Sequence, residues 1–136
     1  MPTARTSSAA VHIPEWGVLV LGGVEASYKR LQVAELLQSE RSGDEYAYSW
    51  CTINPMQVAR YSPSAVYFNN RVFVVSHREN KFESLSLTSP KSSQWTILHD
   101  CPVPDDYKLF MCVFNGRILL SCRLNCSELP IDNIFL

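Results

Sequence analysis

Residues 64–76 read Ser-Ala-Val-Tyr-Phe-Asn-Asn-Arg-Val-Phe-Val-Val-Ser, two runs of β-branched and aromatic residues on either side of an asparagine pair. β-branched and aromatic residues favour strands, and asparagine accepts the positive φ angles of a two-residue hairpin turn. The segment therefore predicts a β-hairpin that turns at Asn69-Asn70.

The same hairpin recurs further along the chain, which indicates an internal repeat. The turn is repeated in the segment Phe114-Asn115-Gly116-Arg117, where Asn-Gly favours a two-residue hairpin turn more strongly than Asn-Asn does. We align Val113 with Val66, 47 residues earlier, and expect the hairpins over residues 64–76 and 108–121 to occupy equivalent positions.

A further copy of the repeat unit precedes the one that contains residues 64–76, and corresponding residues of these first and second copies keep a fixed spacing. Arg5 precedes Arg60 by 55 residues, and Pro14-Glu15-Trp16-Gly17 takes the place of the hairpin turn as a turn two residues longer. Later in each unit, Trp50 matches Trp95. The order of these features predicts four short strands per unit, which is typical of one propeller blade. We therefore expect an all-β fold of four-stranded antiparallel blades.

Residues 29–38 are built mostly from good helix formers, so a helix is the alternative here. We favour a strand, because the second unit has a strand at the corresponding place. Residues 39–48 are polar and are expected to form a loop insertion, which repeat folds tolerate.

The composition limits the functions that the chain can have. Of its 136 residues, 46% are hydrophobic and 18% are charged, and the formal net charge is -1. No cluster of Lys or Arg provides the attraction that dominates nucleic-acid binding. The longest aliphatic run, residues 18–21, is far shorter than the ~20 residues that cross a bilayer. We expect a cytoplasmic protein that binds neither nucleic acid nor membrane.

No arrangement of residues predicts an enzyme. The three histidines, His12, His77 and His99, fall at unrelated places in the unit, and none has a zinc-like partner. The cysteines are odd in number and irregularly spaced, so we interpret them as free, buried thiols; they are Cys51, Cys101, Cys112, Cys122 and Cys126. We expect no catalytic residue, no metal and no cofactor.

The ordered motifs resemble kelch repeats. The shared pattern is Pro-Met-x-x-x-Arg, a small-small-Val strand, a turn, an aliphatic strand that ends in Gly-Gly, an Ala-Glu-Leu strand and a tryptophan. The resemblance implies a kelch-type β-propeller fragment of about two and a half blades. Its parts are repeat 1 over 1–54, repeat 2 over 55–100, a partial repeat 3 over 101–121 and a C-terminal tail over 122–136. Kelch-like rings have five to seven blades, so the resemblance implies an incomplete ring.

Some repeat positions have structural roles, and others depart from the pattern. Gly22 and Gly23 predict a positive φ or a close approach of backbone, and the two tryptophans predict packing between blades. The second repeat has Ser76 and His77 in place of the glycines. In the third repeat we place Tyr107 at the position of the arginine.

The resemblance implies a protein-interaction module. Similar kelch propellers read a short partner segment at the mouth, and many follow a BTB domain as substrate receptors of cullin-type ubiquitin ligases. Other kelch proteins bind or cross-link actin, which is the alternative function. The expected partner-binding residues open each repeat: Arg5, Thr6, Ser7, Arg60, Tyr61, Ser62, Tyr107 and Lys108. The two arginines have a second possible role, hydrogen bonding to strand carbonyls.

Overall fold

The computed structural model describes residues 1–89, 92–101, 107–124 and 132–135. The described secondary structure consists of strands, with no helix among these residues. The strands are β1 (Ala9–Ile13), β2 (Gly17–Leu21), β3 (Ala34–Ser42), β4 (Glu45–Ile53), β5 (Pro63–Phe68), β6 (Arg71–Ser76), β7 (Glu79–Ser86), β8 (Trp95–Asp100), β9 (Tyr107–Phe114), β10 (Arg117–Leu124) and β11 (Asp132–Phe135). The expectation of an all-β chain is confirmed, and the helical alternative for residues 29–38 is wrong.

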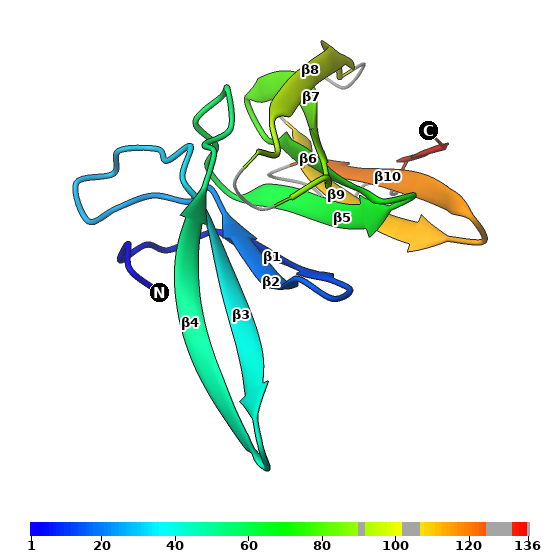
Figure 1. The fold of residues 1–136 in the computed structure, drawn as a ribbon. Helices are drawn as coiled ribbons and strands as arrows, with labels where there is room; N and C mark the ends of the chain where they lie inside the picture. The colour runs from blue at the N-terminus through cyan, green and yellow to red at the C-terminus, as the bar shows by residue number, and fades with distance from the viewer. Residues whose placement is uncertain (90–91, 102–106, 125–131, 136) are drawn as a thin grey trace.

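The strands form three antiparallel sheets that follow the order of the repeats (Figure 1). Two sheets have four strands each, in the orders β1-β2-β3-β4 and β5-β6-β7-β8. The third has the order β11-β10-β9, with β11 pairing along the far edge of β10. The first strands lie side by side, since β5 contacts both β1 and β9, while β4 and β8 diverge from the centre.

The pairing register matches the first two sheets residue by residue. Val18 pairs with Leu37, which pairs with Trp50; in the second sheet the equivalent row is Val72, Leu85 and Trp95. Directly opposed residues in an antiparallel sheet share a face. The two tryptophans therefore hold equivalent positions, as the repeat predicted.

The third hairpin is equivalent to the second, but the spacing of 47 residues is wrong by one. Phe68 pairs with Arg71 and Phe114 pairs with Arg117, which sets the spacing at 46. Because the turn fixes the register of a hairpin, a shift of one residue moves a side chain to the other face. Val66 is accordingly 8% exposed, whereas Val113 is 43% exposed.

The same shift corrects the alignment at the start of the third repeat. Tyr107 corresponds to Tyr61, and Lys108 corresponds to Ser62. The position equivalent to the arginine falls at 106, which lies outside the described residues. Tyr107 is thus not the replacement of the arginine.

The expected loop over residues 39–48 is instead the outer half of a regular hairpin. Strands β3 and β4 pair without interruption from Ala34↔Ile53 to Ser42↔Glu45. Gly43 and Asp44 form the turn, so polar composition alone did not exclude a strand here. In the first repeat the β1–β2 turn is also shorter than expected, because Gly17 already pairs with Ile13.

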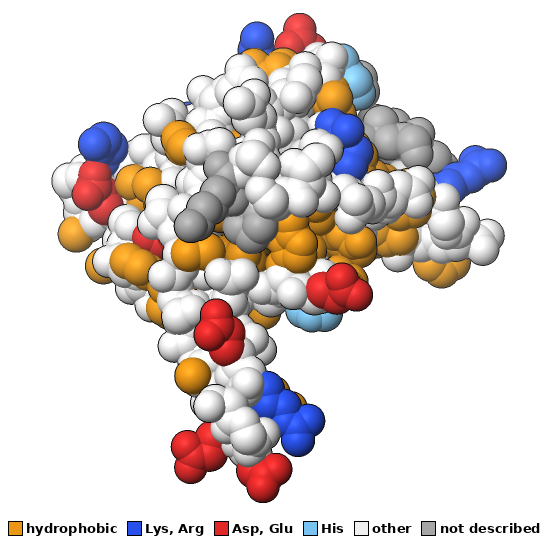
Figure 2. Space-filling model, in the orientation of Figure 1, with side chains coloured by type: hydrophobic (Ala, Val, Ile, Leu, Met, Phe, Trp, Pro, Cys, Tyr) orange, Lys and Arg blue, Asp and Glu red, His pale blue; other side chains and the backbone are white. Residues whose placement is uncertain are grey.

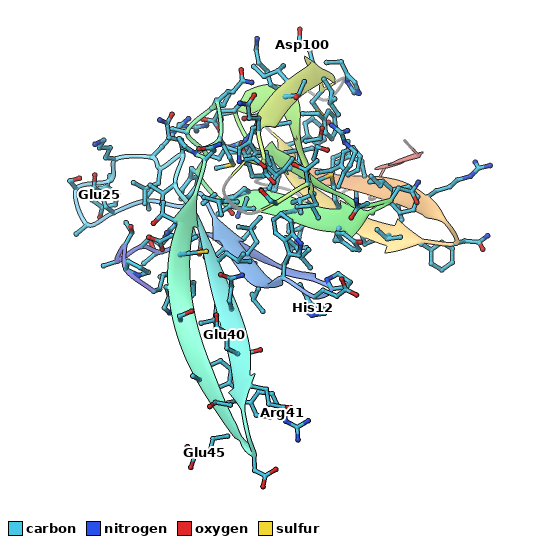
Figure 3. All side chains as sticks on the ribbon, viewed as in Figure 1. His12, Glu25, Glu40, Arg41, Glu45 and Asp100 are labelled. Atoms are coloured by element: carbon cyan, nitrogen blue, oxygen red, sulfur yellow. The ribbon has the colours of Figure 1, made fainter. Side chains whose placement is uncertain are left out.

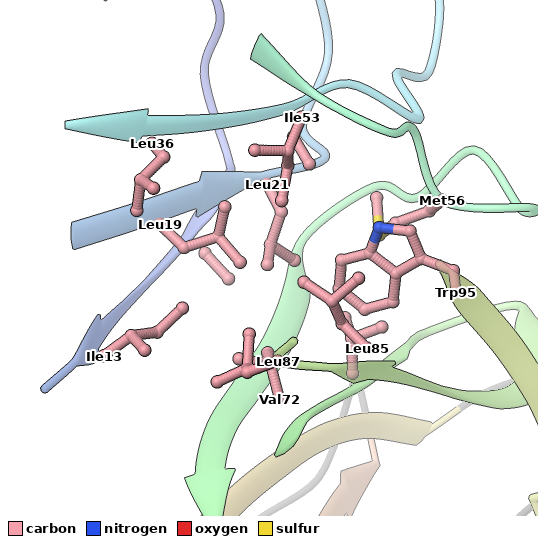
Figure 4. Close-up of a cluster of buried hydrophobic side chains, with 13 residues drawn as sticks. Ile13, Leu19, Leu21, Leu36, Ile53, Met56, Val72, Leu85, Leu87 and Trp95 are labelled. Atoms are coloured by element: carbon pink, nitrogen blue, oxygen red, sulfur yellow. The ribbon is translucent and has the colours of Figure 1, made fainter. Parts of the chain in front are cut away.

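The hydrophobic core lies between the sheets. Figure 4 shows the larger cluster, in which Leu19, Leu36 and Ile53 of the first sheet face Val72 and Trp95 of the second. A second cluster joins the other face of the second sheet to β9 and β10, with Val75, Phe82, Met111 and Leu120 among its members. Trp95 packs between the first two sheets, as expected, whereas Trp50 is only partly buried and belongs to neither cluster, so the expectation of packing between blades holds for Trp95 alone.

Gly22 and Gly23 have positive φ angles of 64° and 98°. A Cβ on Gly23 would lie 2.5 Å from the carbonyl oxygen of Thr6, and one on Gly22 would lie 3.0 Å from that of Arg60. Both predicted reasons for glycine therefore hold.

The cysteines are less uniformly buried than expected. Cys101 and Cys122 are buried, Cys51 is partly buried and Cys112 is exposed, which corrects the expectation for Cys112. Cys126 lies outside the described residues.

Among the residues with a described structure, no helix has the length and apolar character to cross a membrane.

Candidate functional site

Arg5 enters the first sheet and forms an ion pair with Glu35 on β3. The same guanidinium donates to the carbonyl oxygens of Gly22 and Val33, each at 3.2 Å. Glu35 also accepts a hydrogen bond of 2.6 Å from the hydroxyl of Thr3. Both charged side chains are inaccessible to solvent, so Arg5 holds the start of β3 to the segment before β1.

Arg60 repeats this arrangement in the second sheet. Its Nη2 lies 2.8 Å from Oε1 of Glu83 and donates to the carbonyl oxygen of Lys81 at 2.7 Å. Its Nη1 donates to the hydroxyl of Ser76 at 3.1 Å. Ser76 is the residue of the second repeat that corresponds to Gly22 in the first. Glu83 further accepts the backbone N–H groups of residues 57 and 58. Burial lowers the pKa of Arg60, an effect that the hydrogen bond and charge of Glu83 oppose.

The two arginines therefore donate hydrogen bonds to backbone carbonyls and form ion pairs with buried carboxylates. Of their two expected roles, this is the structural one. Arg60 has no solvent-accessible surface, and neither does the side chain of Arg5. A partner could reach these guanidinium groups only by displacing the surrounding chain. Of the expected partner-binding residues, the neighbours of the two arginines are therefore the ones that a partner can reach.

Ser7 and Ser62 connect the first two repeats. Both have positive φ angles, 54° and 47°, and the N–H of Ser62 donates to the carbonyl oxygen of Ser7 at 3.1 Å. Thr6 exchanges two backbone hydrogen bonds of 2.9 Å with Val24. Residues with a positive φ thus stand at equivalent places shortly before β1 and β5.

A pocket of about 90 Å³ lies where β5 and β9 begin. The structure brings together here three of the expected residues, Tyr61 and Ser62 from the second repeat and Lys108 from the third. The other lining residues are Pro63, Ser64, His77, Leu109 and Phe110. Among the described residues no ion pair joins Lys108, so its exposed ammonium group is the available cation of this pocket.

His77 lines this pocket and contacts the backbone of Tyr107. Nδ1 of His77 lies 2.9 Å from the carbonyl oxygen of Tyr107. A carbonyl can only accept, so Nδ1 carries the proton in this contact. Sequence reasoning missed His77, although its place in the Gly-Gly position of the repeat marked it as a departure. Tyr107 contributes its backbone to this contact.

A second and larger hollow of about 440 Å³ lies at the start of the first sheet. It is lined by Arg5 and Thr6 from the expected set and by the loop over residues 24–28. Tyr28 in this loop is 87% exposed and has a φ of 63°. The two pockets share no lining residue, so the expected residues divide between two places.

The described residues contain no group of three or more His, Cys, Asp or Glu side chains arranged to hold a metal ion. Searches of protein-family models and of curated proteins found no match to this chain.

Proposed function

We propose that the chain is an arc of a kelch-type β-propeller and that it binds a short acidic peptide segment of a partner protein. The observation that carries this proposal is the pocket between β5 and β9, which gathers Tyr61, Ser62 and Lys108 from two repeats. A solvated cation, a hydroxyl group and an aromatic ring suit a carboxylate side chain with an apolar neighbour.

The uncovered sheet faces support the propeller arc. Val72 and Trp95 are buried against the first sheet, but their equivalents Val18 and Trp50 are only partly buried on a face with no sheet beyond it among the described residues. At the other end, Phe110 and Phe114 are exposed on β9. Further blades would cover both faces in the way that the two existing interfaces are covered.

The resemblance to kelch repeats extends this proposal to a biological role. The favoured role is the substrate-recognition propeller of a BTB-kelch-like adaptor for a cullin-type ubiquitin ligase. A longer reading frame with an N-terminal BTB region would support that role. Co-sedimentation with actin filaments tests the alternative of a cytoskeletal scaffold, and binding that Lys108→Glu leaves unchanged would place the actin site elsewhere.

The peptide site is tested with charge reversal on the third sheet. The probe is a fluorescein-labelled peptide of glutamate, leucine and glycine, and binding is followed by fluorescence anisotropy. Lys108→Glu should weaken binding by roughly tenfold, about the effect of losing one charged contact. Tyr61→Ala should weaken it by a similar factor, because the aromatic contact is lost. Arg117→Glu, at the opposite end of the β9–β10 hairpin, is the matched control and should bind as the unmodified chain does. Equal weakening by Lys108→Glu and Arg117→Glu would show general charge attraction and contradict the site.

A further inference from the structure

Residues 38–49 form the outer part of the β3–β4 hairpin, here called the arm. Strand β2 pairs with β3 only over residues 34–37, so the arm continues as a two-stranded ribbon. Figures 1 and 2 show that it projects away from the rest of the molecule. Every residue from Ser39 to Ser49 is exposed. Contacts within the chain therefore do not explain which side chains the two faces of the arm present to solvent.

One face of the arm carries a row of aromatic side chains. Residues two apart on a strand share a face, so Tyr46 and Tyr48 continue the row that begins at Trp50. Their exposed fractions are 59% and 70%, and neither belongs to a core cluster. Across the ribbon they are opposed by Arg41 and Ser39. Aromatic rings in this arrangement offer a large apolar area to a molecule that covers them.

The opposite face of the arm is acidic. Glu40 is opposed by Ala47, and Glu45 is opposed by Ser42, so the two carboxylates share that face as diagonal neighbours. Figure 3 shows Glu45 at the outer end of the hairpin and Glu40 farther from the tip. Within the described part of the chain, neither carboxylate has an ion-pair partner. This face is complementary to a basic side chain.

The edge of the arm is open to backbone pairing. Among the described strands, β4 pairs with β3 alone, so half of its N–H and C=O groups point away from the sheet. Its nine residues contain no proline and no lysine, and its pairing has no bulge. The equivalent edge strand β8 is shorter, and its pairing with β7 is interrupted between Lys81 and Glu83. Of the devices that usually protect an edge, proline, lysine and a bulge are thus absent from β4, and its one charged residue, Glu45, stands at its outer end.

We propose that the arm is a second protein-binding site, at which an extended peptide segment adds to β4 as a further strand. Backbone hydrogen bonds would give affinity, and the alternating side chains would give specificity. Apolar residues of the partner would lie against Tyr46, Tyr48 and Trp50, and a basic residue would lie beside Glu45. This partner is opposite in charge to the acidic peptide of the β5–β9 pocket, and the two sites share no residue, so each proposal can fail without the other.

The test uses the full chain and a fluorescein-labelled nine-residue peptide that alternates valine with lysine. Two further peptides carry N-methyl groups on the amides of one edge or of the other, which removes hydrogen-bond donors from that edge. Anisotropy should show saturable binding of the unmodified peptide and a loss of at least roughly tenfold for one methylated form only. Retention of binding by both methylated peptides would exclude strand addition, and absence of saturable binding up to about 1 mM would overturn the proposal.

Matched substitutions locate the bound peptide. Tyr46→Ser with Tyr48→Ser should weaken binding by roughly tenfold or more, whereas Tyr28→Ser, at an exposed tyrosine outside the arm, should have no effect. Glu45→Lys should weaken binding, and Glu15→Lys in the β1–β2 turn should not. Equal losses in a variant and its control would overturn the proposal.

Hydrogen exchange on the unmodified chain checks the location without any substitution, so a variant that disturbs the ribbon does not decide the outcome. The bound peptide should protect amides in β4. Protection that appears only around Tyr61 and Lys108 would assign the peptide to the pocket and overturn the arm site.

Discussion

Arg60 and Glu83 form an ion pair in which both side chains are completely buried, with Nη2 and Oε1 separated by 2.8 Å. Glu83 also accepts two backbone N–H groups, and Arg60 donates to Ser76 and Lys81. Such a pair contributes little net stability over an apolar replacement, but the loss of one partner leaves an uncompensated buried charge. The pair therefore holds the segment before β5 in place against β7.

Arg60→Ala should lower the free energy of unfolding by about 3–5 kcal/mol, because the carboxylate of Glu83 would keep its burial and lose its cation. Urea denaturation followed by circular dichroism measures this effect. The control is Arg78→Ala, an exposed arginine in the β6–β7 turn, which should change stability by less than about 0.5 kcal/mol. Similar small effects at both positions would mean that Arg60 is not structural.

Trp95→Ala should destabilise the chain far more than Trp50→Ala, although the two residues are equivalent in the repeat. Trp95 is 5% exposed in the core between the first two sheets, and its indole N–H donates to the carbonyl oxygen of Asn54 at 2.9 Å. Its loss should cost about 3–5 kcal/mol. Trp50 lies on the uncovered face and should cost clearly less. Denaturant midpoints compare the two, and equal shifts would contradict the assignment of the faces.

Gly23→Ala should be strongly destabilising, whereas Gly43→Ala should cost only about 1–2 kcal/mol. Both glycines have a positive φ, but a Cβ on Gly23 meets the carbonyl oxygen of Thr6 at 2.5 Å, and one on Gly43 meets nothing within 4 Å. The comparison separates steric exclusion from backbone strain. Thermal melting of the two variants measures it, and the expected order is wrong if Gly43→Ala melts lower.

The chain should self-associate in a concentration-dependent manner. The face that carries Val18 and Trp50 has the pattern of a buried face, and Phe110 and Phe114 are exposed on the third sheet. Apolar sheet faces without cover favour association. Sedimentation velocity over a range of concentrations should show species larger than a monomer, and Phe110→Ser with Phe114→Ser should reduce them. A stable monomer at all concentrations would contradict this expectation.

Local signals predicted the β5–β6 and β9–β10 hairpins correctly, because their turns depend on a few adjacent residues. Asn69, Asn70, Asn115 and Gly116 all have φ angles between 47° and 69°, which asparagine and glycine tolerate. The spacing of the arginines likewise identified equivalent positions in the first two repeats. Where two signals competed, the turn decided the register: the match between Val66 and Val113 rested on residue type alone and was wrong by one residue.

The sequence by itself determined the all-β class, the turns at Asn69-Asn70 and Asn115-Gly116, the need for glycine at Gly22 and Gly23, and the equivalence of the first two repeats, since each follows from backbone preferences or from periodic side chains. Only the tertiary structure decided the role of Arg5 and Arg60, because their carboxylate partners lie 30 and 23 residues further along the chain. It also decided that polar residues 39–48 extend a hairpin and that Tyr61 and Lys108 share a pocket. A turn is set by neighbouring φ angles, whereas the burial and partners of a side chain depend on residues that only folding brings near.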